Sequence, residues 1–340
     1  MSVSASTFVP DVRFLVDRSG SMLQPLNPAD PMCRGCTTNC PANCTLRSTA
    51  LLSTADRFFT TNTTAGRYGL VLFPSNGSCG PPTQVASPLP MSDDPSVLSM
   101  MAAATMTQLR SASFSGGTPT SPALQFSLAT TGLANETNRD HFLVLVTDGL
   151  PNCNPMNANT CMTPNCRCTT GQCSGQSCTL GCLDRQETLD ALVLARAKDV
   201  RTLVIGFAND VNLGSGPQLF DELGRAGAPL ACPTAGRSEC GANNPCRPDG
   251  TCTRAYSNEL GAGFDRVAEL IKRSKACRWT LDQPVADGPG FEVRVNGLVV
   301  SKGAQGWQAE NPSTVRFGGA VCEVLAQPNA QVPVSFTLLP

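Results

Sequence analysis

The feature that most constrains this 340-residue chain is a pair of apolar runs that each lead into an acidic residue. Val12–Val16 is followed by Asp17-Arg18-Ser19-Gly20-Ser21, and Phe142–Val146 is followed by Thr147-Asp148-Gly149. Near-continuous apolar runs of this length are typical of strands covered on both faces of a sheet. In open sheets of this kind, ligand-binding residues follow the carboxyl ends of the strands. We therefore expect both acids at one edge of a buried parallel sheet.

Further apolar runs at Gly69–Phe73 and Leu203–Phe207 alternate with amphipathic stretches. These stretches carry apolar residues three and four positions apart, the spacing of a helix with one buried face. They are Leu51, Leu52, Ala55, Phe58 and Phe59; Leu189, Leu192, Val193 and Val200; and Leu260, Phe264, Val267, Leu270 and Ile271. Alternating strands and helices predict an α/β fold with a doubly wound, mostly parallel, Rossmann-like sheet.

The segments after the strands carry oxygen donors that fit one divalent-metal site. Asp17, Ser19, Ser21 and Asp148 are joined by Thr118, which lies in the glycine-rich segment Gly116-Gly117-Thr118. Two carboxylates and three hydroxyls suit Mg2+, a hard cation that takes oxygen ligands and keeps several waters. Each segment alone resembles an ordinary polar turn, so the prediction depends on all three together.

In these segments the chain resembles the von Willebrand factor type A (VWA) family, in a cysteine-rich, exported bacterial form. Asp17-Arg-Ser-Gly-Ser-Met22 is similar to the family's Asp-x-Ser-x-Ser motif. Gly117-Thr118-Pro-Thr120 is similar to its threonine loop, and Thr147-Asp148-Gly149 to the loop of its second aspartate. The resemblance covers roughly residues 10 to 275. It implies a metal-ion-dependent adhesion site, with Mg2+ as the expected metal and Mn2+ or Ca2+ as alternatives, that binds a carboxylate from an Asp or Glu of a protein ligand.

Eighteen cysteines, most of them in three polar stretches, indicate an oxidising environment. We therefore expect an extracellular, periplasmic or cell-surface protein. Met1–Pro10 has neither a basic start nor an apolar core, so we expect any export signal to lie upstream. The alternative for the cysteines is zinc, because the spacing of Cys33, Cys36, Cys40 and Cys44 is compatible with a four-thiolate site.

The cysteine clusters also predict pairings, given the strand order that the VWA resemblance implies. In that order the loops after the first, second and Asp148-bearing strands are neighbours. We therefore expect Cys79 to pair with a cysteine of the 153–182 insertion, and the Cys33–Cys44 cluster to form two local bridges. A further bridge is expected between Cys277 and Cys322. The long insertion at 153–182 is interpreted as a specificity loop that shapes or covers the metal's surroundings.

Two domains are expected. Residues 1–276 form the VWA domain with cysteine-rich insertions at about 24–44, 153–182 and 230–253, and residues 277–340 form a small β appendage. Within the appendage, Phe291–Val295, Asn296-Gly297 and Leu298–Val300 predict a hairpin because Asn-Gly favours the tight turn that matches strand twist. Short strands are also expected at Ser313–Phe317 and Val332–Leu338.

The expected function is binding rather than catalysis. The single histidine, His141, begins the strand that leads to Asp148, roughly 23 Å away at about 3.3 Å per residue, so it is expected to have no special role. A net charge of −1 gives no case for nucleic acid, and no apolar run is long enough for a membrane span. The alternatives are a structural envelope protein with a self-masked metal site, an intracellular VWA assembly factor, and a metal-dependent hydrolase.

Overall fold

The structure is a computed structural model that describes most of the chain. The residues it does not describe are 34–35, 37–39, 76–78, 131–132, 134–135, 137, 161–165, 170–172, 174–177, 209–214, 228–253, 287, 289, 328–330 and 340. The expected insertion at 230–253, with Cys232, Cys240, Cys246 and Cys252, therefore lies outside the described residues.

A parallel sheet lies at the centre of the larger unit, with strand order β4-β3-β5-β6 among the described strands. Its strands are β3 (Asp11–Asp17), β4 (Arg67–Phe73), β5 (His141–Thr147) and β6 (Val200–Gly206). Alternate side chains of β3 point to opposite faces: Val12, Phe14 and Val16 join one apolar core, and Leu15 joins the other. Burial on both faces explains why the strands appear in the sequence as continuous apolar runs.

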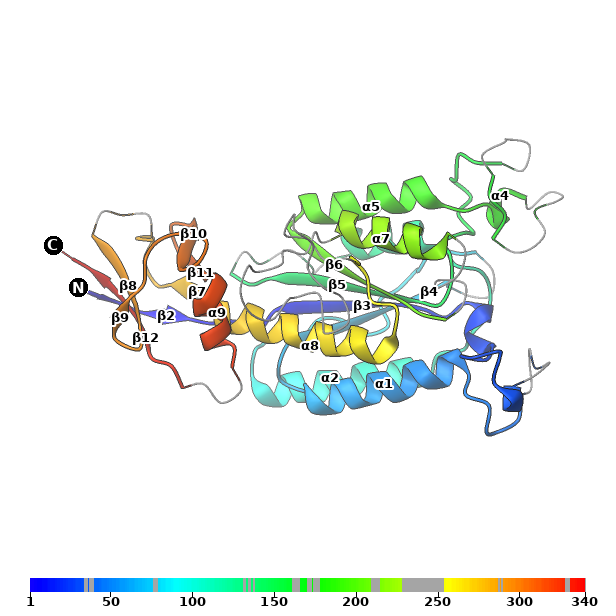
Figure 1. Ribbon diagram of the computed structural model, residues 1–340, viewed down its shortest axis with the longest axis horizontal. Helices are drawn as coiled ribbons and strands as arrows, with labels where there is room; N and C mark the ends of the chain where they lie inside the picture. Colours follow the sequence, from blue (N-terminus) through cyan, green and yellow to red (C-terminus); the bar gives the residue numbers. More distant parts are fainter. Residues whose placement is uncertain are drawn as a thin grey trace.

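Helices cover both faces of this sheet, as Figure 1 shows. One core contains side chains of α1 (Arg47–Thr61), α2 (Pro95–Arg110) and α8 (Leu260–Cys277). The other contains side chains of α3 (Thr120–Ala129), α5 (Arg185–Ala197) and α7 (Gly216–Gly227). The fold is thus the α/β, doubly wound one expected from the sequence. Val200, expected in a helix, instead begins β6.

A second, smaller unit consists of two antiparallel sheets, with strand orders β1-β12-β8-β9 and β10-β11-β7-β2. Its elements are β1 (Ser2–Val3), β2 (Ala5–Ser6), β7 (Arg278–Leu281), β8 (Phe291–Val295), β9 (Leu298–Val299), β10 (Trp307–Asn311), β11 (Thr314–Phe317), β12 (Val334–Leu338) and helix α9 (Gly319–Leu325). The expected hairpin is present: Asn296 and Gly297 both have positive φ between β8 and β9. Because β1 and β2 belong to these sheets, the unit draws on both ends of the chain, and 277–340 is not its whole extent.

Disulfides hold the loops at the carboxyl end of the central sheet. Cys33–Cys44 and Cys36–Cys40 form the two local bridges, and Cys79 pairs with Cys153 of the insertion after β5. The described part of that insertion contains the bridges Cys166–Cys182 and Cys168–Cys173, beside the short helix α4 (Cys178–Gly181). Cys277 and Cys322, with Cα atoms 5.3 Å apart, join α8 to α9. None of the described cysteines is a free thiol.

A helix that crosses a bilayer needs about 20 mostly apolar residues. No helix among the described residues is both long and apolar enough to cross a membrane.

Candidate metal site

The candidate site lies where β3 and β5 end. Asp17 is the last residue of β3, and Asp148 directly follows β5. The short 3-10 helix η1 (Gly20–Leu23) carries Ser21. Because β3 and β5 are adjacent and parallel, their carboxyl ends bring the two aspartates to the same edge. Both aspartates are fully buried.

Hydrogen bonds fix the carboxylate of Asp17 from two sides. The backbone N–H of Ser19 donates to Oδ1 at 2.7 Å, and the hydroxyl of Thr147 donates to Oδ2 at 2.6 Å. A carboxylate with both oxygens engaged in this way has little freedom to rotate, so it is held in one orientation before any ligand arrives.

A chain of hydroxyls connects the serines to the second aspartate. Ser19 Oγ and Ser21 Oγ lie 2.9 Å apart, and Ser21 Oγ donates to Asp148 Oδ1 at 2.9 Å. Ser19 is buried, whereas Ser21 is partly exposed to solvent. The two hydroxyls and the carboxylate therefore form one connected group that is open on the side of Ser21.

Thr118 reaches the same place from the loop between α2 and α3. A methyl group placed on Gly149 would lie 3.9 Å from both Thr118 Oγ1 and Ser21 Oγ, so the two hydroxyls face a common region. The loop is anchored by bonds from Gly20 N–H to Gly116 O at 2.9 Å and from Thr118 N–H to the side chain of Asn152 at 2.9 Å. The structure thus brings together all five residues that the sequence singled out.

A sixth residue, Arg47, was not found by sequence reasoning. It is the first residue of α1, and its Nη1 donates to Asp148 Oδ2 at 2.8 Å. Both side chains are almost completely buried, at 4% and 0% exposed. An arginine at the start of a helix carries no pattern that marks it as buried, and its distance from Asp148 in the sequence hides the pairing.

The electrostatics of the site indicate a shortage of positive charge. Burial, followed by the charge of Asp148, raises the pKa of Asp17 to about 7, although hydrogen bonds from Thr147 and Ser19 act to lower it. The donors are oxygens throughout, which suits a hard divalent cation. A cation held by Asp17, Ser19, Ser21, Thr118 and Asp148 would offset the repulsion between the two aspartates, so these residues fit such a metal.

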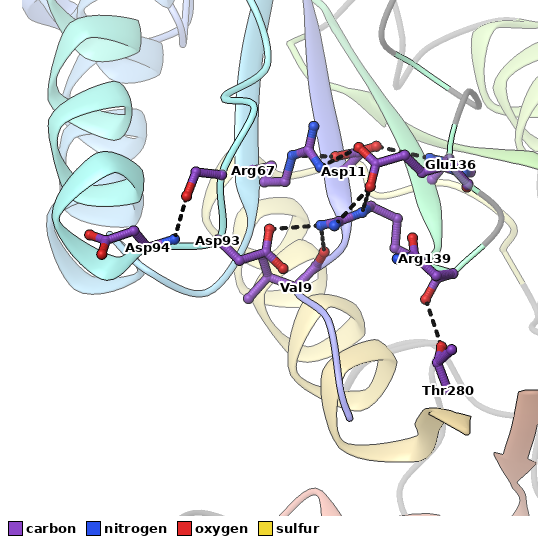
Figure 2. Close-up of polar contacts among 11 residues, drawn as sticks. Val9, Asp11, Arg67, Asp93, Asp94, Glu136, Arg139 and Thr280 are labelled. Carbon is purple, nitrogen blue, oxygen red and sulfur yellow. Dashed lines mark hydrogen bonds and ion pairs between the residues drawn. The ribbon is translucent and has the colours of Figure 1, made fainter. Parts of the chain in front are cut away.

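The opposite end of the sheet holds a second group of charged side chains, in which Asp11, Arg67 and Arg139 are buried (Figure 2). Arg67 pairs with Asp11 at 3.1 Å and with Glu136 at 2.6 Å. Arg139 pairs with Glu136 at 2.9 Å and with Asp93 at 2.8 Å, and it also donates to the carbonyl of Val9.

His141 belongs to this second group. Its Nε2 donates to the carbonyl of Glu136 at 2.6 Å, and its Nδ1 lies 3.1 Å from Asp11 Oδ2. The expectation that His141 has no special role was therefore wrong, because the ring is buried and links a carboxylate to a loop. It lies at the far end of β5 from Asp148, so it does not take part in the candidate metal site.

Asp140 extends the second group into the smaller unit. It accepts two hydrogen bonds from Arg316, at 2.5 and 3.2 Å, and one from Ser274 at 2.6 Å. Burial alone would raise the pKa of Asp140, but Arg316, Ser274 and Arg278 bring it down to about 2. These contacts join the amino end of β5 to α8 and β11.

The strand order of the central sheet and the three loops at its carboxyl edge agree with the arrangement that the VWA resemblance of the sequence leads us to expect. No protein-family model matches the sequence, and no curated protein matches it.

Several solved structures are similar. The pilus adhesin SpaC of Lactobacillus rhamnosus GG is 16% identical, with a TM-score of 0.44 over 97% of this chain and 40% of that one. A point mutant of the PilB minor pilin of Streptococcus sanguinis is 15% identical, with a TM-score of 0.48 over 78% and 61%. The vWF domain of the type V pili tip protein Mfa5 of Porphyromonas gingivalis is 16% identical, with a TM-score of 0.45 over 79% and 97%. The chain thus spans less than two thirds of SpaC and PilB, and similarity at this level says nothing about a shared ligand.

Proposed function

We propose that this protein is an exported, metal-dependent protein-binding module and not an enzyme. Asp17, Ser19, Ser21, Thr118 and Asp148 would hold Mg2+, with Mn2+ or Ca2+ as alternatives. The metal would offer a position to a carboxylate from an Asp or Glu of a partner protein. The observation that carries this proposal is the meeting of two buried carboxylates and three hydroxyls at one sheet edge.

The chemistry of the donors supports recognition rather than catalysis. Three of the five donors are neutral hydroxyls, so a divalent metal bound there would remain electron-poor and would favour an anionic ligand. The one histidine lies at the other end of β5 and is bonded to Asp11 and Glu136, so it does not serve as a general base at this edge. The disulfides of the described loops support an exported location.

Metal-dependent stability tests the site directly. A ligand that binds the folded state alone adds about 2.7 kcal/mol when its free concentration is a hundred times its dissociation constant. Millimolar Mg2+ or Mn2+ is therefore expected to raise the melting temperature of the wild type. Asp17→Ala and Asp148→Ala should abolish the rise, whereas the exposed carboxylate variant Asp265→Ala should keep it. An equal rise in all four proteins would contradict the assignment.

One observation favours the self-masked alternative as a second candidate. The insertion after β5 packs directly against the threonine loop: a methyl group on Gly117 would lie 2.4 Å from Cys153 Sγ. Bound Mn2+ separates the two functions, because it speeds the relaxation of water protons that exchange at an open site. A strong increase in the water-proton relaxation rate would support an open binding site. No increase with Mn2+ bound would support the structural, masked form.

A further inference from the structure

The position of Arg47 points to a third charge in the candidate metal site. We propose that the Arg47 guanidinium lowers the affinity of the site for a divalent cation and raises the affinity of the metal-loaded site for an anionic ligand. The proposal rests on the proposed function, since it concerns how the same site selects what it binds. It assigns to Arg47 a role in specificity rather than in direct ligation.

Arg47 occupies one side of Asp148. Its Nη1 lies 2.8 Å from Oδ2, while the other oxygen of Asp148 accepts the Ser21 hydroxyl. One oxygen of Asp148 is thus paired with the Arg47 guanidinium, and the other belongs to the hydroxyl chain of the site. A divalent cation near Asp148 would have to share its carboxylate with a charge of the same sign, which weakens metal binding.

The backbone around Arg47 holds it in this position. The N–H of Arg47 donates to the carbonyl of Gln24 at 3.0 Å, and the N–H of Leu26 donates to the carbonyl of Thr45 at 2.9 Å. These bonds join the start of α1 to the segment that directly follows η1, and η1 itself carries Ser21. The Arg47 side chain is only 4% exposed, so its charge is held almost entirely within the protein, next to Asp148.

The formal net charge of the site depends on whether metal and ligand are bound. Two carboxylates and one guanidinium leave one net negative charge, and a divalent cation would turn it into one net positive charge. A ligand carboxylate would then bring the site to neutrality. Without Arg47, the metal alone would neutralise the two aspartates, and a ligand carboxylate would add an uncompensated negative charge. Uncompensated charge is costly in a buried site, so Arg47 favours the state in which both metal and anion are bound.

Arg18, the arginine within the Asp17–Met22 motif, differs from Arg47 in its surroundings. It is partly exposed, and its Nε donates to the neutral carbonyl of Pro74 at 2.7 Å. Arg18 therefore does not reduce the charge of either aspartate through a direct contact in the way that Arg47 does. This contrast assigns the specificity role to Arg47.

The test measures Mn2+ affinity by electron paramagnetic resonance, which reports free Mn2+, with and without acetate as the carboxylate probe. Acetamide, which is similar in size and neutral, is the ligand control. In the wild type, acetate should tighten Mn2+ binding and acetamide should not. Arg47→Met and the milder Arg47→Gln should bind Mn2+ about tenfold or more tightly and lose the acetate effect, and Arg47→Lys should retain it.

Arg67→Met provides a matched control, because Arg67 is equally buried and also pairs with a buried aspartate, at the other end of the sheet. It should leave Mn2+ affinity and the acetate effect unchanged. Equal or weaker Mn2+ binding by both Arg47→Met and Arg47→Gln would overturn the role of Arg47 while leaving the metal site in place. If Arg47 variants do not fold, an equal effect of acetate and acetamide on the wild type overturns it instead. Absence of Mn2+ binding by the wild type and the variants alike would overturn the proposed function as well.

Discussion

The two ends of the central sheet contain the same kinds of residue but balance their charges differently. At the carboxyl end lie Asp17 and Asp148, and one arginine, Arg47, pairs with Asp148. At the amino end, the carboxylates of Asp11, Asp93, Glu136 and Asp140 contact Arg67, Arg139, Arg278 and Arg316. Burial of an acid therefore does not by itself mark a binding site. What distinguishes the candidate site is a buried carboxylate pair with too little positive charge around it.

The pKa values of Asp17, at the carboxyl end, and Asp140, at the amino end, reflect the same difference in charge balance. Burial and a neighbouring carboxylate raise the pKa of Asp17 to about 7, whereas arginine partners lower the pKa of Asp140 to about 2. One group is thus placed where it gains from an added cation, and the other already has its cations within the fold. We interpret the amino end as a structural junction between the two units.

The largest expected effect tests this interpretation of the amino end. Asp140→Ala removes the buried carboxylate that Arg316 and Arg278 both contact, and it leaves them the partly exposed Glu310 as a remaining partner. Removing one member of a buried ion pair typically costs 3–5 kcal/mol, so the free energy of unfolding should fall by about that amount. Urea denaturation measures the change. The Mn2+-induced rise in stability should survive in this variant, and its loss would show that the two ends are coupled.

A smaller effect is expected when the pH is lowered. Because the pKa of Asp140 is depressed, its stabilising contribution is fully present above its ordinary value of 3.8 and is lost as the pH falls towards 2. One pKa unit corresponds to about 1.4 kcal/mol, so this contribution amounts to about 2 kcal/mol. Denaturation of the wild type and of Asp140→Asn between pH 5 and pH 2 should show a steeper loss in the wild type. Parallel curves would argue against Arg316 as the cause.

The smallest effect is expected at an exposed ion pair far from both ends. Arg57 and Asp265 lie 3.5 Å apart on the surfaces of α1 and α8, with side chains 63% and 76% exposed. Exposed pairs contribute about 0–1 kcal/mol because solvent screens them. Asp265→Ala should therefore change the free energy of unfolding by less than about 0.5 kcal/mol. A loss as large as that of Asp140→Ala would remove the distinction between buried and exposed pairs in this protein.

Much of the fold could be predicted from the sequence because burial leaves periodic patterns. Strands covered on both faces produced continuous apolar runs, and Asn296-Gly297 marked the hairpin turn. The strand order implied by the VWA resemblance predicted a bridge from Cys79 to a cysteine of the 153–182 insertion, and the structure shows that this cysteine is Cys153. The five candidate ligands were found because each lies next to a strand end or in a glycine-rich loop.

The features of the fold and of the candidate site that the sequence did not predict depend on contacts between distant residues, which leave no local pattern in the sequence. Arg47 meets Asp148 from a distant part of the chain, and His141 meets Asp11 on the adjacent strand, 130 residues away in the sequence. The two-residue strands β1 and β2 are too short to show alternation, so their pairing with β12 and β7 could not be expected from residues 1–10. Such features become visible when the three-dimensional partners are known.

The pairing of β1 with β12 has a mechanical consequence. The two strands are antiparallel, with Ser2 opposite Thr337 and Val3 opposite Phe336, so the described ends of the chain leave from the same place (Figure 1). Tension that pulls these ends apart would peel this short ladder open one hydrogen bond at a time, since the load does not act on all the bonds together. The larger unit, inserted between β2 and β7, lies outside the direct line of that force. A load on the ends would therefore be absorbed first by the smaller unit, while the carboxyl edge of the central sheet, at the far end of the molecule, keeps its shape.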